Sequence, residues 1–109
     1  MKKPTLNILP DGTQEWRLDG KLHRVDGPAI ISQGGIESWW LNDKLHRVDG
    51  PAITWVNGSQ CWYLNGEFHR EDGPAITRAD GTEEWYLNGE RVDPLVYLVM
   101  TYERNLSNL

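Results

Sequence analysis

Three histidines stand at equal intervals along this chain, and each opens the same string of residues, His-Arg-x-Asp-Gly-Pro-Ala. A histidine close to a carboxylate suits general acid–base catalysis or metal binding. The residues that could carry this chemistry are His23, Arg24, Asp26, His46, Arg47, Asp49, His69, Arg70 and Asp72.

The spacing of these strings argues against both chemistries. Equivalent residues of successive repeats would lie two strands apart, roughly 9.6 Å, whereas zinc holds each ligand nitrogen at about 2.0–2.1 Å. One ion therefore cannot reach two repeats. Three identical copies also suit a structural task better than one asymmetric active site, and no serine or cysteine recurs beside them as a nucleophile. We expect no enzyme, no catalytic residue, no metal and no cofactor.

The structural interpretation of the strings is that they stabilise the loops that contain them. The aspartate side chain can fix a turn before Gly and Pro, and Arg and His can then satisfy loop carbonyls and carboxylates. An enzyme or small-ligand binder that uses these loops is the least favoured hypothesis.

The strings belong to a repeat of 23 residues. Glycine, tryptophan and leucine recur with the same spacing, and the tryptophans are Trp16, Trp39, Trp62 and Trp85. A fixed period of this size indicates one supersecondary unit stacked on copies of itself. We predict an all-β fold, a single-layer antiparallel meander of four stacked β-hairpin repeats with a short C-terminal capping helix.

One domain, residues 1–109, accounts for the whole chain. It comprises an N-terminal edge strand (1–10), repeats at 11–33, 34–56 and 57–79, a truncated fourth repeat (80–93) and a capping helix (94–106). Each unit opens on a pair such as Asp11-Gly12, which suits a type I′ turn, and a second turn pair follows at the position of Asp19-Gly20. The main strands are expected at 5–9, 13–18, 28–32, 36–41, 51–55, 59–64, 74–78 and 82–87, with a small extra strand around 21–24.

The expected helix begins where the fourth unit departs from the pattern. Asp93 can cap the helix, Pro94 suits its first position, and the apolar residues that follow share one helical face. A terminal repeat of an array commonly differs because the last sheet edge needs cover. We expect the helix to cover part of the sheet near Tyr86.

The unit resembles a known repeat. Ala79-Asp80-Gly81, Glu84-Trp85 and Asn88-Gly89 resemble the membrane occupation and recognition nexus (MORN) repeat, and residues 62–76 look like a variant found in phage and giant-virus proteins. The resemblance covers residues 11 to about 90 and implies stacked hairpins with scaffold or binding roles. The chain has Arg-x-Asp-Gly-Pro after the histidine where the parent repeat has Gly-x-Gly.

Side-chain alternation divides each first strand into two faces. Trp16, Trp39, Trp62 and Trp85 form a packing ladder on one face. The residue after each tryptophan points to the opposite face, which we call the aromatic face and which carries Arg17, Trp40, Tyr63 and Tyr86. Ala29, Ala52 and Ala75 are expected near them. Trp, Tyr and Arg are enriched at binding hot spots, so this face is the candidate protein-binding site.

Composition narrows the class of partner. The formal net charge is −5 and no basic stripe appears, which argues against nucleic acid and anionic membranes. One cysteine permits no intramolecular disulfide. We therefore expect a cytoplasmic, non-enzymatic protein–protein interaction module. The resemblance implies a viral or phage protein, and an inhibitor of a host defence protein fits that setting. The alternative is a structural or assembly protein that acts as a homo-oligomer, such as a homodimer.

Overall fold

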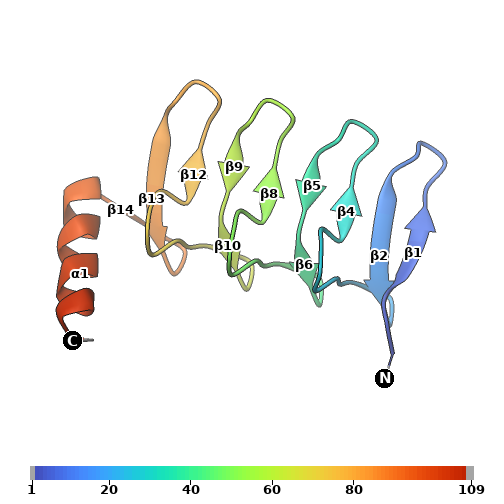
Figure 1. Cartoon of the computed structure of the whole chain (residues 1–109), viewed down its shortest axis with the longest axis horizontal. Coiled ribbons are helices and arrows are strands. Elements are labelled where there is room, and N and C mark those ends of the chain that lie inside the picture. Colours follow the sequence, from blue (N-terminus) through green and yellow to red (C-terminus); the bar gives the residue numbers. More distant parts are fainter. Residues whose placement is uncertain (1, 108–109) are drawn as a thin grey trace.

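The computed structural model describes residues 2–107 and shows one layer of short antiparallel strands followed by a helix (Figure 1). The molecule measures 48 × 37 × 20 Å, so the layer is long and thin. The predicted fold class, an all-β antiparallel meander with a C-terminal helix, is confirmed.

The strands are shorter and more numerous than the sequence predicts. In chain order the elements are β1 (Thr5–Ile8), β2 (Gln14–Leu18), β3 (Lys21–Leu22), β4 (Ile30–Ile31), β5 (Glu37–Ser38), β6 (Trp40–Leu41), β7 (Lys44–Leu45), β8 (Ile53–Thr54), β9 (Gln60–Cys61), β10 (Tyr63–Leu64), β11 (Glu67–Phe68), β12 (Ile76–Thr77), β13 (Glu83–Leu87), β14 (Glu90–Val92) and α1 (Pro94–Ser107). The central sheet has the order β1-β2-β4-β5-β8-β9-β12-β13-β14, with β3 paired to β2. The pairs β6–β7 and β10–β11 form separate hairpins.

In the second and third repeats, the predicted first strand is divided into two short strands at its tryptophan, Trp39 or Trp62. The backbone N–H of Trp39 donates to the carbonyl of Ala52, while the carbonyl of Trp39 accepts from the N–H of His46. The residues before Trp39 thus pair within the central sheet, and those after it pair with the hairpin strand β7. The second strands are also short because Pro28 and its equivalents have no N–H to donate to the ladder. The expected extra strand near 21–24 is present as β3.

The type I′ geometry expected at the opening turn of each unit is found instead at the second turn. The pair Asp19-Gly20 has positive φ at both residues, 52° and 81°, as a type I′ turn requires. In the opening pair Asp11-Gly12 only the glycine has positive φ, 90°. There the N–H of Leu9 donates to the carbonyl of Thr13, which makes a three-residue loop ending in a left-handed glycine. The predicted type I′ geometry of the opening turns is therefore wrong.

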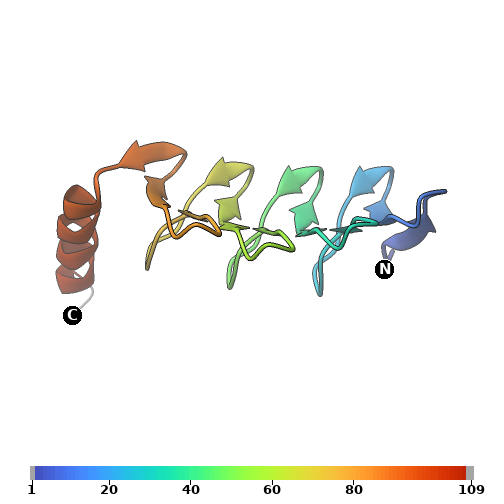
Figure 2. The same ribbon diagram turned by 90° about the horizontal axis from the view of Figure 1, so that it is seen from above.

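The single layer has two different sides. Figure 2 shows the hairpin strands β3, β7, β11 and β14 tilted to one side of the central sheet, and the loops between hairpins together with α1 on the other. The loops belong to the tryptophan side, since the guanidinium of Arg47 lies 4.0 Å from the ring centre of Trp39. The tilted hairpins therefore lie over one face of the central sheet, and the loops and α1 lie over the other.

The helix begins as the sequence predicts, but it lies on the other side of the layer. The carboxylate of Asp93 accepts the N–H of Leu95 at 2.9 Å, which caps the first turn. Tyr97 then contacts the backbone of Arg70 and Gly73, in the loop beside the tryptophan ladder. The expectation that α1 covers the sheet near Tyr86 is wrong, because its inward side chains bond to that loop.

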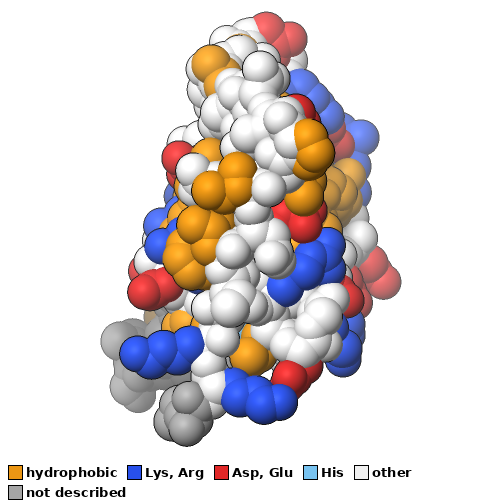
Figure 3. All heavy atoms as spheres, turned by 90° about the vertical axis from the view of Figure 1, so that its right-hand side faces the viewer, with side chains coloured by type: hydrophobic (Ala, Val, Ile, Leu, Met, Phe, Trp, Pro, Cys, Tyr) orange, Lys and Arg blue, Asp and Glu red, His pale blue; other side chains and the backbone are white. Residues whose placement is uncertain are grey.

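The strand β1 forms the exposed edge expected at the N-terminal end. All four of its residues are exposed, and Ile8 retains 67% of its accessible surface. Figure 3 views this end of the molecule, where hydrophobic side chains lie among charged ones. Lys2 forms an ion pair with Asp19 at 2.8 Å beside the edge, and such charges discourage open-ended strand pairing.

Candidate protein-binding face

The strand register brings the predicted aromatic residues onto one side of the layer. Trp40 pairs with Leu45, Tyr63 pairs with Phe68 and Tyr86 pairs with Arg91. Directly paired residues of antiparallel strands place their side chains on the same face. Each aromatic side chain therefore lies beside the side chain of its hairpin partner.

Phe68 joins two of the predicted residues into one aromatic stack. Its ring centre lies 4.4 Å from that of Tyr63 and 4.9 Å from that of Tyr86, so a single ring bridges two successive repeats. All three side chains are half-buried. Sequence reasoning missed Phe68 because its equivalents are leucines, Leu22 and Leu45, and the hairpin strand that carries it was not resolved from the pattern.

A second apolar row runs along the same face. The register pairs Ile30 with Ser38, Ser38 with Ile53, Ile53 with Cys61 and Cys61 with Ile76. The isoleucines recur at intervals of 23 residues, a signal in the sequence that could have identified the row.

The alanines do not belong to the aromatic face. The N–H of Trp16 donates to the carbonyl of Ala29 at 2.7 Å, and the register of β2 with β4 places these two residues opposite each other. Ala29 is fully buried beside the tryptophan ladder. The expectation that the alanines lie near the aromatic residues is wrong, because directly paired residues share a face and Ala29 is paired with Trp16 and not with Arg17.

Between the isoleucine row and the tilted hairpins lies a groove of about 410 Å³, the aromatic groove. Aromatic, aliphatic and sulfur-bearing side chains make up most of its wall. Its lining residues are Trp55, Asn57, Ser59, Cys61, Tyr63, Phe68, Ile76, Thr77 and Arg78.

The charged groups at the groove are already paired. Arg78 forms an ion pair with Glu84, and the hydroxyl of Tyr86 donates to the same carboxylate at 3.2 Å. The hydrogen bond from Arg78 lowers the pKa of Glu84 below its usual range. Burial raises the pKa of the Cys61 thiol, which favours its neutral form. The groove thus offers a mixed surface, in which aromatic and aliphatic side chains lie beside Asn57, Ser59, Thr77 and the ion-paired Arg78.

Arg17 is occupied by contacts within its own unit. Its guanidinium bonds to the carboxylate of Glu15 at 3.1 Å and to the carbonyl of Gly20 at 2.9 Å. The indole N–H of Trp40 likewise donates to the hydroxyl of Ser38 at 2.8 Å. The groove itself lies further along the sheet, around Tyr63.

The three loop strings make the same contacts in each copy. The arginine donates to the aspartate two residues later and to the proline carbonyl, and it lies over the preceding tryptophan; for Arg70 the partners are Asp72, Pro74 and Trp62. Each histidine accepts the backbone N–H of an asparagine 19 residues later through Nδ1. The pairs are His23 with Asn42, His46 with Asn65 and His69 with Asn88, at 3.1, 2.9 and 2.9 Å.

These contacts explain the spacing of the strings. Each histidine connects its own unit to the turn of the next hairpin, so its Nδ1 atom stabilises the packing of one repeat on another. Within residues 2–107 no group of three or more His, Cys, Asp or Glu side chains is arranged to hold a metal ion.

The fourth tryptophan lacks such an arginine. Asp93 stands where the arginine of a fourth string would lie, and the helix begins at the next residue.

The described residues include no helix that is both long enough and apolar enough to cross a membrane. No protein family, curated protein or solved structure matches this chain.

Proposed function

We propose that this chain is a non-enzymatic protein-binding module, and that it holds an apolar segment of its partner in the aromatic groove. The observation that carries the proposal is the stack of Tyr63, Phe68 and Tyr86 next to a 410 Å³ groove. Large aromatic side chains on a rigid framework are the residues that anchor protein interfaces.

The framework supports this role because the aromatic and aliphatic lining residues sit on, or next to, paired strands. Tyr63 and Phe68 belong to one hairpin, and Cys61 and Ile76 pair across the central sheet. A preformed site loses little conformational entropy on binding. The net charge of −5 and the apolar lining disfavour nucleic acid as the partner.

The nature of the partner follows from the sequence resemblance. The phage and giant-virus repeats that residues 62–76 resemble would place the protein in the cytoplasm of a host cell. We propose a host protein as the partner, with a defence protein as the first to test.

The test is affinity capture from a host lysate with the wild type and two variants. Trp55→Ala/Tyr63→Ala removes two walls of the groove, and Val56→Ala is the matched control because Val56 is 73% exposed next to Trp55. Circular dichroism establishes that all three proteins are folded. We expect a host protein to be held by the wild type and the control and lost by the double variant.

Two results would contradict the proposal. A partner retained equally by the double variant would show that the groove is not the site. Recovery of this chain alone would favour the alternative of a homo-oligomer. A catalytic role of the loops would require His46→Ala to abolish an activity without lowering the free energy of unfolding, which its bond to Asn65 argues against.

A further inference from the structure

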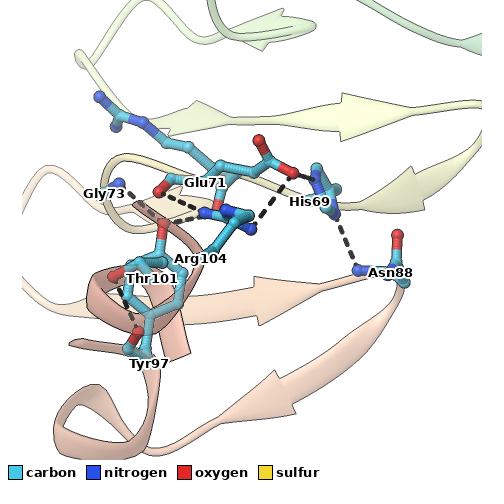
Figure 4. Close-up of polar contacts among 8 residues, drawn as sticks. His69, Glu71, Gly73, Asn88, Tyr97, Thr101 and Arg104 are labelled. Carbon is cyan, nitrogen blue, oxygen red and sulfur yellow. Dashed lines mark hydrogen bonds and ion pairs between the residues drawn. The ribbon is translucent and has the colours of Figure 1, made fainter. Parts of the chain in front are cut away.

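The side chain of Tyr97 on α1 inserts into the third loop string. It is 2% exposed, whereas its neighbours Leu98 and Val99 are 60% and 56% exposed. Its hydroxyl donates to the carbonyl of Arg70 at 2.6 Å and accepts the N–H of Gly73 at 3.0 Å. Figure 4 shows Tyr97 directed at this loop. A single hydroxyl thus joins the two ends of the four-residue segment 70–73.

The backbone of this segment selects a hydroxyl. A carbonyl oxygen only accepts a hydrogen bond, and an N–H only donates one. The group that lies between them must therefore donate and accept at once. A hydroxyl does both, whereas an ammonium or guanidinium group only donates and a carboxylate only accepts.

The first two loop strings have the same shape as the third. A Cβ atom at Gly27, Gly50 or Gly73 would lie 2.7, 2.7 or 2.8 Å from Cζ of the arginine three residues earlier. Gly27 and Gly50 are buried. Among the described residues, however, none donates to the carbonyl of Arg24 or Arg47, and none accepts the N–H of either buried glycine. A buried backbone group without a partner is costly, so a hydroxyl at these segments would be stabilising.

A pocket adjoins each of these two segments on its C-terminal side, which is the side from which Tyr97 reaches the third. The pocket between the first and second strings has a volume of about 330 Å³ and is lined by Trp39 and Leu41. The pocket between the second and third strings has a volume of about 420 Å³ and is lined by Trp62 and Leu64. Figure 2 shows α1 in line with the three loops, in the place that a fourth loop would take. Pockets of this size with apolar walls and a few polar groups suit an aromatic side chain.

The residue after the arginine differs between the third string and the first two. In the third string it is Glu71, whose carboxylate lies 3.4 Å from the guanidinium of Arg104 on α1. In the first two strings it is Val25 and Val48, which line the pockets and are 74% and 76% exposed. The third string therefore matches the charge of α1, whereas the first two match an apolar neighbour of the tyrosine.

We propose that the first two loop strings bind two tyrosine side chains of a partner protein. Each hydroxyl lies between the arginine carbonyl and the glycine N–H, as the hydroxyl of Tyr97 does in the third string. The two sites continue the interface between the third string and α1 along the same row of loops. They lie on the tryptophan side of the layer, opposite the aromatic groove, so they are independent of the proposed function.

The spacing of the two sites determines the form of the partner segment. Equivalent points of successive repeats lie roughly 9.6 Å apart. A polyproline II segment has three residues per turn and rises about 3.1 Å per residue, so side chains three positions apart point the same way at about 9.3 Å. A β-strand would turn the same two side chains to opposite faces. The partner segment is therefore proline-rich with the pattern Tyr-x-x-Tyr, and its prolines supply the apolar neighbours that the two valines favour.

The charge of the loops restricts the tyrosines to the unmodified form. The side chains of Asp26 and Asp49 are 88% and 84% exposed beside the two sites. A phosphate would remove the hydroxyl proton and bring negative charge toward these carboxylates.

Titration of the full chain with the peptide Ac-Tyr-Pro-Pro-Tyr-NH2, followed by ¹H–¹⁵N NMR, tests the proposal. We expect the N–H signals of Gly27 and Gly50 to move downfield and to saturate with a Kd on the order of 0.1–1 mM, because the second tyrosine binds intramolecularly once the first is held. The signal of Gly73 should not move, since its N–H already bonds to Tyr97.

Three peptides and one variant are the controls. Ac-Phe-Pro-Pro-Phe-NH2 lacks only the hydroxyls and should bind at least about tenfold more weakly. Ac-Tyr-Pro-Tyr-NH2 changes the spacing, the doubly phosphorylated Tyr-Pro-Pro-Tyr peptide adds charge, and both should also bind at least about tenfold more weakly. In Tyr97→Ala the third site becomes accessible, so N-acetyltyrosinamide should then move the signal of Gly73 as well.

Four results would overturn the proposal. Signals of Gly27 and Gly50 that do not move would show that the first two strings bind no tyrosine. Equal binding of the phenylalanine peptide would exclude the hydroxyl as the recognised group, and equal binding of Ac-Tyr-Pro-Tyr-NH2 would exclude the Tyr-x-x-Tyr pattern. Signals that move only around Tyr63 would assign the peptide to the aromatic groove. Trp55→Ala/Tyr63→Ala should leave the shifts of Gly27 and Gly50 unchanged, so failure of the groove and failure of these sites are distinguishable.

Discussion

We predict that Gly50→Ala, in the second His-Arg-x-Asp-Gly-Pro-Ala string, destabilises the protein. The cause is displacement of the Arg47 side chain and not strain in the backbone. A Cβ atom at Gly50 would lie 2.7 Å from Cζ and 2.9 Å from Nε of Arg47, which is too close for any real contact. Gly50 does not have a positive φ, so alanine is acceptable to the backbone itself. The guanidinium must therefore move.

The cost follows from what Arg47 loses when it moves. Its guanidinium lies 4.0 Å from the ring centre of Trp39, donates to the carbonyl of Pro51 at 3.2 Å and pairs with Asp49 at 3.2 Å. The cation–π contact is worth about 0.5–2 kcal/mol and the hydrogen bond about 1 kcal/mol. The carboxylate is 84% exposed, so the ion pair adds little. We expect a loss of about 2–3 kcal/mol.

A double-mutant cycle in urea, followed by tryptophan fluorescence, separates the two mechanisms. In an Arg47→Ala background, Gly50→Ala should cost nothing or stabilise by about 0.4–1 kcal/mol, because alanine restricts the unfolded chain. The coupling energy between the two sites should then be about 2–4 kcal/mol. If Gly50→Ala costs the same in both backgrounds, the clash with Arg47 is not the cause and the reasoning is wrong.

Three further predictions concern other contacts. Tyr97→Phe should lower the free energy of unfolding by about 1–3 kcal/mol, because the carbonyl of Arg70 loses its donor; an unchanged urea midpoint would contradict this. Because Arg78 depresses the pKa of Glu84, the stabilisation is complete above the unfolded pKa of about 4.3 and is lost as pH falls through the lower native pKa; Arg78→Met should flatten the fall in stability below about pH 4.3. His46→Ala should cost about 1–3 kcal/mol by leaving a backbone N–H of the next hairpin without its acceptor, and thermal unfolding that is unchanged would refute it.

Most of the architecture could be predicted because its signals are local and repeated. The 23-residue period, the Gly-containing turn pairs and the Asp93-Pro94 helix start are each visible in a few neighbouring residues. The lengths of the strands could not be predicted in the same way. Whether Trp39 continues a strand depends on which backbone groups of Ala52 and His46 reach it, and these lie 13 and 7 residues away.

The residues of the candidate site likewise fall into those whose position could be predicted from local patterns and those whose position could not. Alternation along one strand correctly separates Tyr63 from Trp62, because successive side chains point to opposite faces. The place of Ala29 was predicted wrongly, since the face of a second strand depends on how many residues the preceding loop contains. Phe68 was missed because its role arises from rings in two different repeats.

Local propensity and periodicity encode the repetition of the chain, the hairpin form of each repeat and the helix at the end of the array, so these features are visible in the residues alone. Tertiary structure alone decided which side the helix covers. The hydroxyl of Tyr97 finds its partners at Arg70 and Gly73, 27 and 24 residues earlier in the chain. That polar attachment turns the apolar residues of α1 outward, which no pattern within the helix could reveal, because an apolar stripe of the same spacing would equally suit a buried face.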